Sequence, residues 1–127
     1  MSAYLFVFLG AGLGGMLRHG VGVVSGRLFG FEFPWGILFV NITGSLAMGL
    51  LAGWLAFKAQ MAWSQELRLF LTTGMLGGYT TFSSFSLDVS VLWERGAFSL
   101  AAVYVLASLV LSFAAVFLGL ALARMAS

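Results

Sequence analysis

The chain has 127 residues, of which 61% are hydrophobic and only 8% are charged, and its mean hydropathy is +1.07. Soluble domains carry about 25% charged residues, so this composition indicates an integral membrane protein with little chain left for a soluble domain. The absence of cysteine excludes disulfides and cysteine metal sites. A net charge of +2 on scattered basic residues argues against nucleic-acid binding.

Four apolar stretches are long enough to cross a membrane, which takes about 20 residues. We expect helices over residues 3–24, 34–57, 66–92 and 97–123, joined by short connections over residues 25–33, 58–65 and 93–96. Pro34, the only proline, suits the first turn of the second helix. The prediction is therefore an all-α membrane protein, with one four-helix transmembrane domain over residues 1–127 and both ends on the same side.

The positive charges barely distinguish the two sides of the membrane. On this topology the side of the N-terminus carries Lys58, Arg68 and Arg124, and the opposite side carries Arg27 and Arg95. The Lys/Arg count of short loops sets orientation, and three against two hardly selects one. We hypothesise that the protein inserts both ways and pairs as an antiparallel homodimer. The alternative is that an excess of one charge is sufficient.

The third predicted helix contains a glycine-rich and hydroxyl-rich stretch, Gly74-Met-Leu-Gly77-Gly78-Tyr-Thr80-Thr81-Phe82-Ser83-Ser84-Phe85-Ser86. Glycines weaken a helix, and broken backbone at membrane depth persists only where protein buries it or where it lines a wet cavity. We therefore expect this helix to be broken near its middle. The two phenylalanines are three residues apart, so on a helix they would share a face.

Other polar groups lie inside the predicted spans. Asn41 is the only asparagine, and its amide either serves a solute or joins two helices. Tyr104, Ser108 and Ser112 are four residues apart and align on one face of the last helix, which favours a polar track over back-bonding by isolated serines. Arg18 is an intramembrane charge that either serves a pore mouth or snorkels and caps carbonyls.

Hydrogen-bond donors, rather than acids, dominate at membrane depth. Asp88 is the only acid inside the spans that is a candidate for a position at depth, and it lies late in the third helix, where solvation at headgroup level is the expectation. Proton-coupled transport needs a titratable group at depth and cation channels use acidic rings, so both are disfavoured. Donors suit an anion or a neutral polar solute, and phenylalanine ring edges are positive, although packing is their ordinary role. The donors are Asn41, Thr80, Thr81, Ser83, Ser84, Tyr104, Ser108 and Ser112.

Over nearly its whole length the sequence resembles the small fluoride channels of the Fluc/CrcB family. The residues that carry the resemblance are Gly10-Ala11-x-x-Gly14-x-x-x-Arg18, Gly36-x-x-x-x-Asn41-x-x-Gly44 and the stretch from Gly74 to Ser86. The sequence departs from the family at Gly15, where alanine is frequent, and at His19, where an aromatic residue is common. Neither departure touches the proposed pore.

The resemblance implies a dual-topology antiparallel homodimer in the bacterial inner membrane that contacts lipid, exports cytoplasmic fluoride passively and confers fluoride resistance without enzymatic activity. It implies a structural sodium ion at the dimer centre, bound by the backbone carbonyls of Gly77 and Thr80 from both subunits. Arg18 would shape the vestibule or serve as a structural charge. The implied fluoride pathway comprises Asn41, Thr81, Phe82, Ser83, Phe85, Tyr104, Ser108 and Ser112.

Two other functions are weighed against the channel. A small multidrug exporter depends on a glutamate in its first helix, whereas this first helix has Arg18 and no acid. A non-transporting membrane assembly subunit would explain the glycines but not the cluster of threonine, serine and phenylalanine. An enzyme is disfavoured because the sequence offers no nucleophile–base pair and no phosphate-binding loop.

Overall fold

The computed structural model describes residues 2–57 and 65–126, and within these residues the protein is helical with no strand. Three of its helices are long and apolar enough to cross a membrane, namely α1, α6 and Trp35–Leu55 of α2. The predicted connection over residues 58–65, with Lys58, lies almost wholly outside the described residues. The elements are α1 (Ser2–Phe29), α2 (Trp35–Phe57), α3 (Gln65–Leu69), the π-helix η1 (Phe70–Leu76), α4 (Gly77–Tyr79), α5 (Phe82–Glu94) and α6 (Phe98–Ala126).

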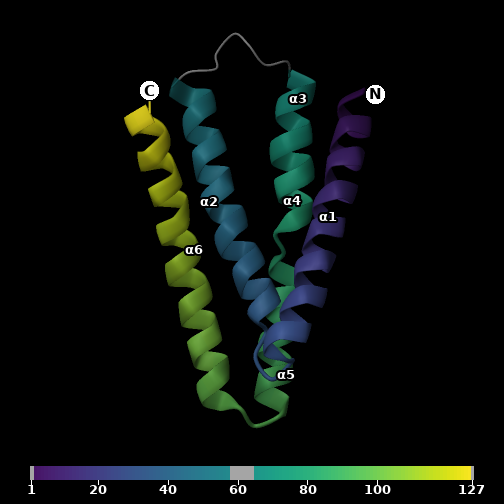
Figure 1. Ribbon diagram of the computed structural model, residues 1–127, viewed down its shortest axis with the longest axis vertical. Helices are drawn as coiled ribbons and strands as arrows, with labels where there is room; N and C mark the ends of the chain where they lie inside the picture. The colour runs from purple at the N-terminus through teal and green to yellow at the C-terminus, as the bar shows by residue number, and fades with distance from the viewer. Residues whose placement is uncertain (1, 58–64, 127) are drawn as a thin grey trace.

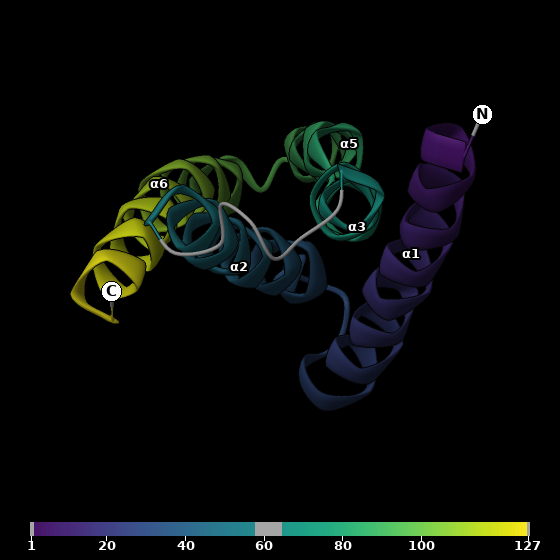
Figure 2. The same cartoon turned by 90° about the horizontal axis from the view of Figure 1, so that it is seen from above.

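The short elements α3, η1, α4 and α5 follow one another along the same direction as the three long helices (Figure 1). Both ends of the chain lie at the same end of the molecule, as predicted (Figure 1). Seen from above, α3 and α5 lie between α1 and the pair formed by α2 and α6 (Figure 2). The main packing contacts join α2 to α6 and α1 to η1 and α4. The broken third helix is therefore held between two layers.

The first helix is longer than predicted. It continues past residue 24 to Phe29, so the expected connection over residues 25–33 is wrong at its start. Ser25 donates its hydroxyl to the carbonyl of Val21 at 2.7 Å and so stays in the helix instead of opening a loop. The helix ends at Gly30, whose φ of +79° is a left-handed conformation that only glycine adopts readily.

Glycines set the distance between neighbouring helices. A Cβ on Gly14 would collide with the carbonyl oxygen of Met75 and lie 2.7 Å from the amide nitrogen of Tyr79. A Cβ on Gly49 would collide with the carbonyl oxygen of Val116 on α6. Each of these glycines follows another small residue by four positions, Gly10 before Gly14 and Ser45 before Gly49, a spacing that lets helix backbones approach closely. Side chains at these positions would separate the helices.

The third helix is interrupted where the sequence predicts a break. α4 ends at Tyr79 and α5 begins at Phe82, with Thr80 and Thr81 between them in extended conformation. The π-helical turns of η1 are not predicted, because a widened turn leaves no signal in an apolar segment. Such turns occur frequently near functional sites.

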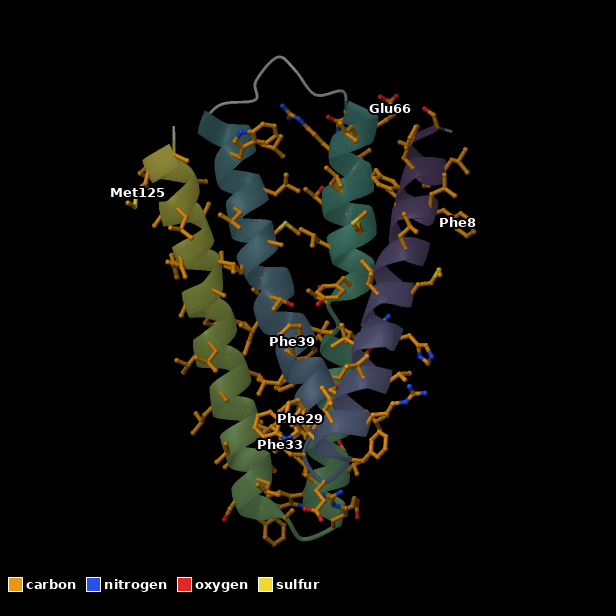
Figure 3. The ribbon with its side chains drawn as sticks, in the orientation of Figure 1. Phe8, Phe29, Phe33, Phe39, Glu66 and Met125 are labelled. Carbon is orange, nitrogen blue, oxygen red and sulfur yellow. The ribbon has the colours of Figure 1, made fainter. Side chains whose placement is uncertain are left out.

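The buried core is small and lies beside the second half of the third helix. It contains Leu38, Phe85, Leu92, Ala101 and Tyr104, with Phe33 packed against it. Most other large apolar side chains point outward, as Phe8 and Met125 do in Figure 3. An apolar exterior around a small core is what a lipid-facing helical protein requires.

Candidate functional site

The break in the third helix is capped by its own side chains. Thr80 has φ −83° and ψ 158°, and Thr81 has φ −155° and ψ 122°. The hydroxyl of Thr81 accepts a hydrogen bond from the backbone N–H of Ser84 at 3.1 Å, which caps the start of α5. The Thr81 and Ser83 hydroxyls lie 3.2 Å apart. Threonine at this position therefore ends the extended segment and starts the next helix.

Asn41 of α2 pairs with the backbone at the break. The N–H of Thr81 donates to Oδ1 of Asn41 at 2.9 Å, and Nδ2 of Asn41 donates to the carbonyl of Thr81 at 3.1 Å. These bonds replace the helical bonds that Thr81 has lost, so the interhelical role considered for Asn41 is present in the fold. An amide NH₂ has two hydrogens, and the second remains for another acceptor.

A cavity of about 400 Å³ lies between α2, α6 and the break. Its wall combines hydroxyls, one amide and three phenylalanine rings with other apolar side chains. Most of the residues predicted for the anion pathway meet here from three separate elements. The lining residues are Asn41, Gly44, Ser45, Met48, Thr80, Thr81, Phe82, Phe85, Ser108, Leu109, Ser112, Phe113 and Val116.

Two of the lining hydroxyls have no partner. The Oγ atoms of Ser108 and Ser112 are buried, and neither makes a hydrogen bond with any described residue. Serines in membrane helices usually donate to the carbonyl four residues earlier, as Ser86 and Ser90 do at 3.0 and 3.1 Å. The back-bonding alternative is therefore wrong for Ser108 and Ser112. Their unpaired hydroxyls are available to a ligand in the cavity, since buried polar groups are normally hydrogen-bonded.

The phenylalanine rings of the site lie in contact. The centroids of Phe82 and Phe85 are 5.5 Å apart, and Phe85 lies 5.0 Å from Tyr104. Phe82 is 74% exposed, whereas Phe85 is 8% exposed. The ring of Phe33 meets Tyr104 edge-on at 5.5 Å. One wall of the site is thus fixed by packing, while Phe82 stands free at its edge.

Asp88 is not the simply solvated residue that we expected. It is half-buried, and its Oδ2 accepts a hydrogen bond from the hydroxyl of Tyr104 at 2.9 Å. Tyr104 is fully buried and lies on the same face of α6 as Ser108, as the spacing predicts, but it does not line the 400 Å³ cavity. The sequence alone did not reveal this pair because its members are 16 residues apart on different helices.

At the break, the carbonyl oxygens of Gly77 and Thr80 lose their usual helical donors. In a continuous helix the N–H of Thr81 would donate to Gly77 and that of Ser84 to Thr80. Here the first donates to Asn41 and the second to the Thr81 side chain. Carbonyl oxygens suit a hard cation. The described residues contain no group of histidine, cysteine and acidic side chains able to hold a metal, so any cation at this break would use backbone oxygens.

Several predicted residues lie apart from the cavity. Ser83 is exposed, and Gly77, at the start of α4 just before the break, is exposed as well. Arg18 lines a separate groove of about 710 Å³ together with His19 and Arg27. The structure does not bring Arg18 to the hydroxyl-lined cavity, so the vestibule role expected for it concerns a different surface.

Some residues of the site were missed. Ser45, Met48 and three apolar residues of α6 line the cavity, but nothing in their local sequence marks them. The hydroxyl oxygens of Thr43 and Tyr79 lie 2.9 Å apart beside the break, within hydrogen-bond distance. The polar composition of Asn41-Ile-Thr43 is the one signal that could have pointed to this contact.

The chain is similar to known proteins along almost its full length. Residues 5–120 match the family described as "CrcB-like protein, Camphor Resistance (CrcB)". A "Fluoride-specific ion channel FluC" of Rhodopseudomonas palustris strain BisB5 is 60% identical over 95% of this chain and 96% of its own. One of Beijerinckia indica subsp. indica is 58% identical over 98% of both chains. A "Fluoride-specific ion channel FluC 2" of Nitrobacter hamburgensis is 53% identical over 95% of this chain and 96% of its own.

Proposed function

Because the chain belongs to the CrcB-like protein family, we propose that it forms a fluoride-specific ion channel. It is a multi-pass bacterial membrane protein and a channel rather than an enzyme. The single structural observation that carries the proposal is the cavity with unpaired Ser108 and Ser112 hydroxyls. A small anion that has lost its water needs fixed donors, and these hydroxyls supply them.

The proposed pathway passes the 400 Å³ cavity. Ser108 and Ser112 donate from α6, the second N–H of Asn41 donates from α2, and the rings of Phe82 and Phe85 turn their positive edges to the ion. Thr81 also lines this cavity, and Ser83 and Tyr104 extend the path beyond it. Asp88 already accepts the hydrogen bond from the Tyr104 hydroxyl. Tyr104 must therefore break this bond before it can donate to an anion.

The transport is passive export of cytoplasmic fluoride, which confers resistance. A negative-inside potential drives an anion outward with about 2.3 kcal/mol per charge per 100 mV. Selectivity against chloride follows from a narrow path and rigid donors that replace the hydration of the smaller ion. The pairing of Asn41 with the Thr81 backbone supplies such rigidity.

We further propose that the functional unit is an antiparallel, dual-topology homodimer in which each subunit crosses the membrane four times, the broken third helix being one crossing. Three features support it. The Lys/Arg bias is only three against two. Phe82 stands 74% exposed at the edge of the site, where a partner would cover it. The described chain buries little of its own apolar surface, since many of its large apolar side chains are exposed.

A structural sodium ion at the centre of this dimer is part of the proposal. The diverted hydrogen bonds at the break free the carbonyls of Gly77 and Thr80, and their oxygens fit a hard cation. When bound, the ion would neutralise these dipoles and tie the two breaks together. Gly77 is exposed on the single chain, which leaves its carbonyl accessible to a shared site.

Two alternatives are less well supported. A multidrug exporter would need an acid in the first helix, and α1 contains none between Ser2 and Phe29. An assembly subunit would have no use for unpaired hydroxyls beside Phe85 in a cavity.

A matched pair of substitutions tests the proposed site. Phe82→Ile removes an exposed ring beside the cavity, and Phe8→Ile removes one of similar exposure, 72% against 74%, from α1. In liposomes that contain equal amounts of dimer, fluoride efflux should fall at least tenfold with Phe82→Ile, which corresponds to about 1.4 kcal/mol of lost interaction. Phe8→Ile should behave as wild type. Equal efflux from both variants would remove Phe82 from the pathway.

A further inference from the structure

One short stretch of α2 contacts three successive residues of the third helix, namely Tyr79, Thr80 and Thr81. Asn41 pairs with the backbone of Thr81. Thr43 meets the hydroxyl of Tyr79 at 2.9 Å. Gly44 lies against Thr80, because a Cβ there would collide with its Cγ2 and lie 3.1 Å from Cδ2 of Tyr79.

The hydrogen bond between Thr43 and Tyr79 has a defined direction. Thr43 Oγ1 lies 2.8 Å from the carbonyl of Phe39 and 3.3 Å from that of Val40, and both carbonyls only accept. A hydroxyl has one hydrogen, so Thr43 donates it to a carbonyl of its own helix. Tyr79 must then donate to Thr43. The contact is a directed bond between α2 and the last residue of α4.

This bond lies close along the chain to the carbonyls of Gly77 and Thr80. Tyr79 lies between Gly77 and Thr80 in the chain, and two peptide units or fewer separate it from either carbonyl. On the other side Thr80 is tied to Leu76, through its N–H at 3.0 Å and its hydroxyl at 3.1 Å. Tethering Tyr79 to α2 therefore limits how far these carbonyls can rotate.

We propose that Thr43 and Tyr79 are a positioning pair that sets the carbonyls of Gly77 and Thr80 for a monovalent cation at the break. The inference rests on the proposed channel and its sodium ion, and it assigns a role to two residues outside the ion's own contacts. Neither side chain touches the cation. They act through the backbone that they hold.

The test measures how sodium stabilises the purified protein. Thermal unfolding in detergent is followed while sodium chloride replaces choline chloride at constant ionic strength, and the sodium dissociation constant is fitted from the rise in Tm. A ligand that binds only the folded state stabilises it with the logarithm of its concentration over its dissociation constant, so a weaker site needs proportionally more sodium for the same rise in Tm. Tyr79→Phe and Thr43→Val each remove one partner and should raise the fitted dissociation constant about fivefold, the effect of one ordinary hydrogen bond. Thr43→Ser keeps the hydroxyl that accepts the bond from Tyr79 and should retain the wild-type sodium response.

Controls remove comparable groups elsewhere. Tyr4→Phe deletes a tyrosine hydroxyl from a side chain that is 81% exposed on α1. Thr72→Val deletes a threonine hydroxyl that is bonded to the carbonyl of Arg68 at 2.7 Å within the third helix itself. Both controls should keep the wild-type sodium response. The double variant, Tyr79→Phe with Thr43→Val, should bind sodium no more weakly than either single variant, because all three variants lose the same hydrogen bond.

A wild-type sodium response in Tyr79→Phe would overturn the proposal, as would a wild-type protein that sodium does not stabilise. Tyr79→Phe alone decides the outcome if Thr43→Val does not fold. Fluoride efflux is measured on the same wild-type preparation. Absence of efflux counts against the channel, whereas efflux together with an unaltered sodium response in Tyr79→Phe counts against the positioning pair only.

Discussion

At the scale of the residue, two sets of helical serines differ in their hydrogen bonding. Ser25, Ser86 and Ser90 donate to carbonyls of their own helices, while Ser108 and Ser112 have no partner among the described residues. A buried polar group without a hydrogen bond costs stability, about 1–3 kcal/mol for its desolvation. The burial of two such hydroxyls in one cavity indicates that a ligand supplies their missing hydrogen-bond partner.

Ser108→Ala should therefore separate stability from transport. Removing an unpaired hydroxyl should leave the thermal midpoint unchanged or raise it, by up to about 1 kcal/mol of unfolding free energy, while fluoride efflux falls several-fold. Ser90→Ala, which removes a hydroxyl bonded to Ser86, serves as the control and should keep efflux. The two measurements are the unfolding midpoint and the efflux rate. A less stable Ser108→Ala protein with normal efflux would show that the hydroxyl serves the fold.

The sequence identified most residues of the cavity but not their partners. Polar side chains inside apolar spans are conspicuous, which is why Asn41, Ser108 and Ser112 could be selected. Their contacts join separate helices, and no local pattern records which helices are neighbours. The pairing of Asn41 with Thr81 and of Tyr104 with Asp88 therefore had to come from the fold.

At the scale of the element, α1 has two different glycine faces. Gly14 lies against the backbone of the third helix, whereas a Cβ on Gly15 would meet nothing within 4 Å among the described residues. Gly14→Ala should push α1 from η1 and α4 and destabilise the protein by about 1–3 kcal/mol, the range for overpacking. Gly15→Ala should be neutral or stabilise by about 0.5–1 kcal/mol, because alanine is the better helix residue.

Thermal unfolding of both variants checks this prediction, with α-helical circular dichroism as the readout. Equal midpoints for the neighbouring substitutions would contradict the close approach of α1 to the third helix.

The elements themselves were predictable to different degrees. Long apolar runs predicted α2 and α6 to within three residues at each end that the structure describes. The glycine-rich and threonine-rich stretch predicted the break, because its composition weakens a helix. The end of α1 was missed because Ser25 and Arg27 look like loop residues, yet the helix continues to Phe29 and stops before Gly30.

At the scale of the whole molecule, the single chain leaves one edge of the site open. Its cavity is walled by α2, α6 and the break, but Phe82 stands exposed beside it. A second copy related by an antiparallel axis would cover this edge and bring two breaks together. The weak charge bias of the loops is what insertion in both orientations requires.

Reporter domains fused after residue 126 test the orientation. A reporter active only in the cytoplasm and one active only outside it should both give strong signals from the same chain. Two added lysines in the loop after Gly30 should shift the ratio toward one orientation, since basic residues remain on the cytoplasmic side. A strong signal from one reporter alone would contradict dual topology.

Anion efflux from liposomes tests the central claim most directly. The purified wild-type protein is reconstituted, and the release of fluoride and of chloride is compared under the same gradient, with protein-free liposomes as the baseline. We predict rapid release of fluoride while chloride is retained. Release of neither anion from protein that is demonstrably dimeric, or release of both at similar rates, would contradict a fluoride-specific channel.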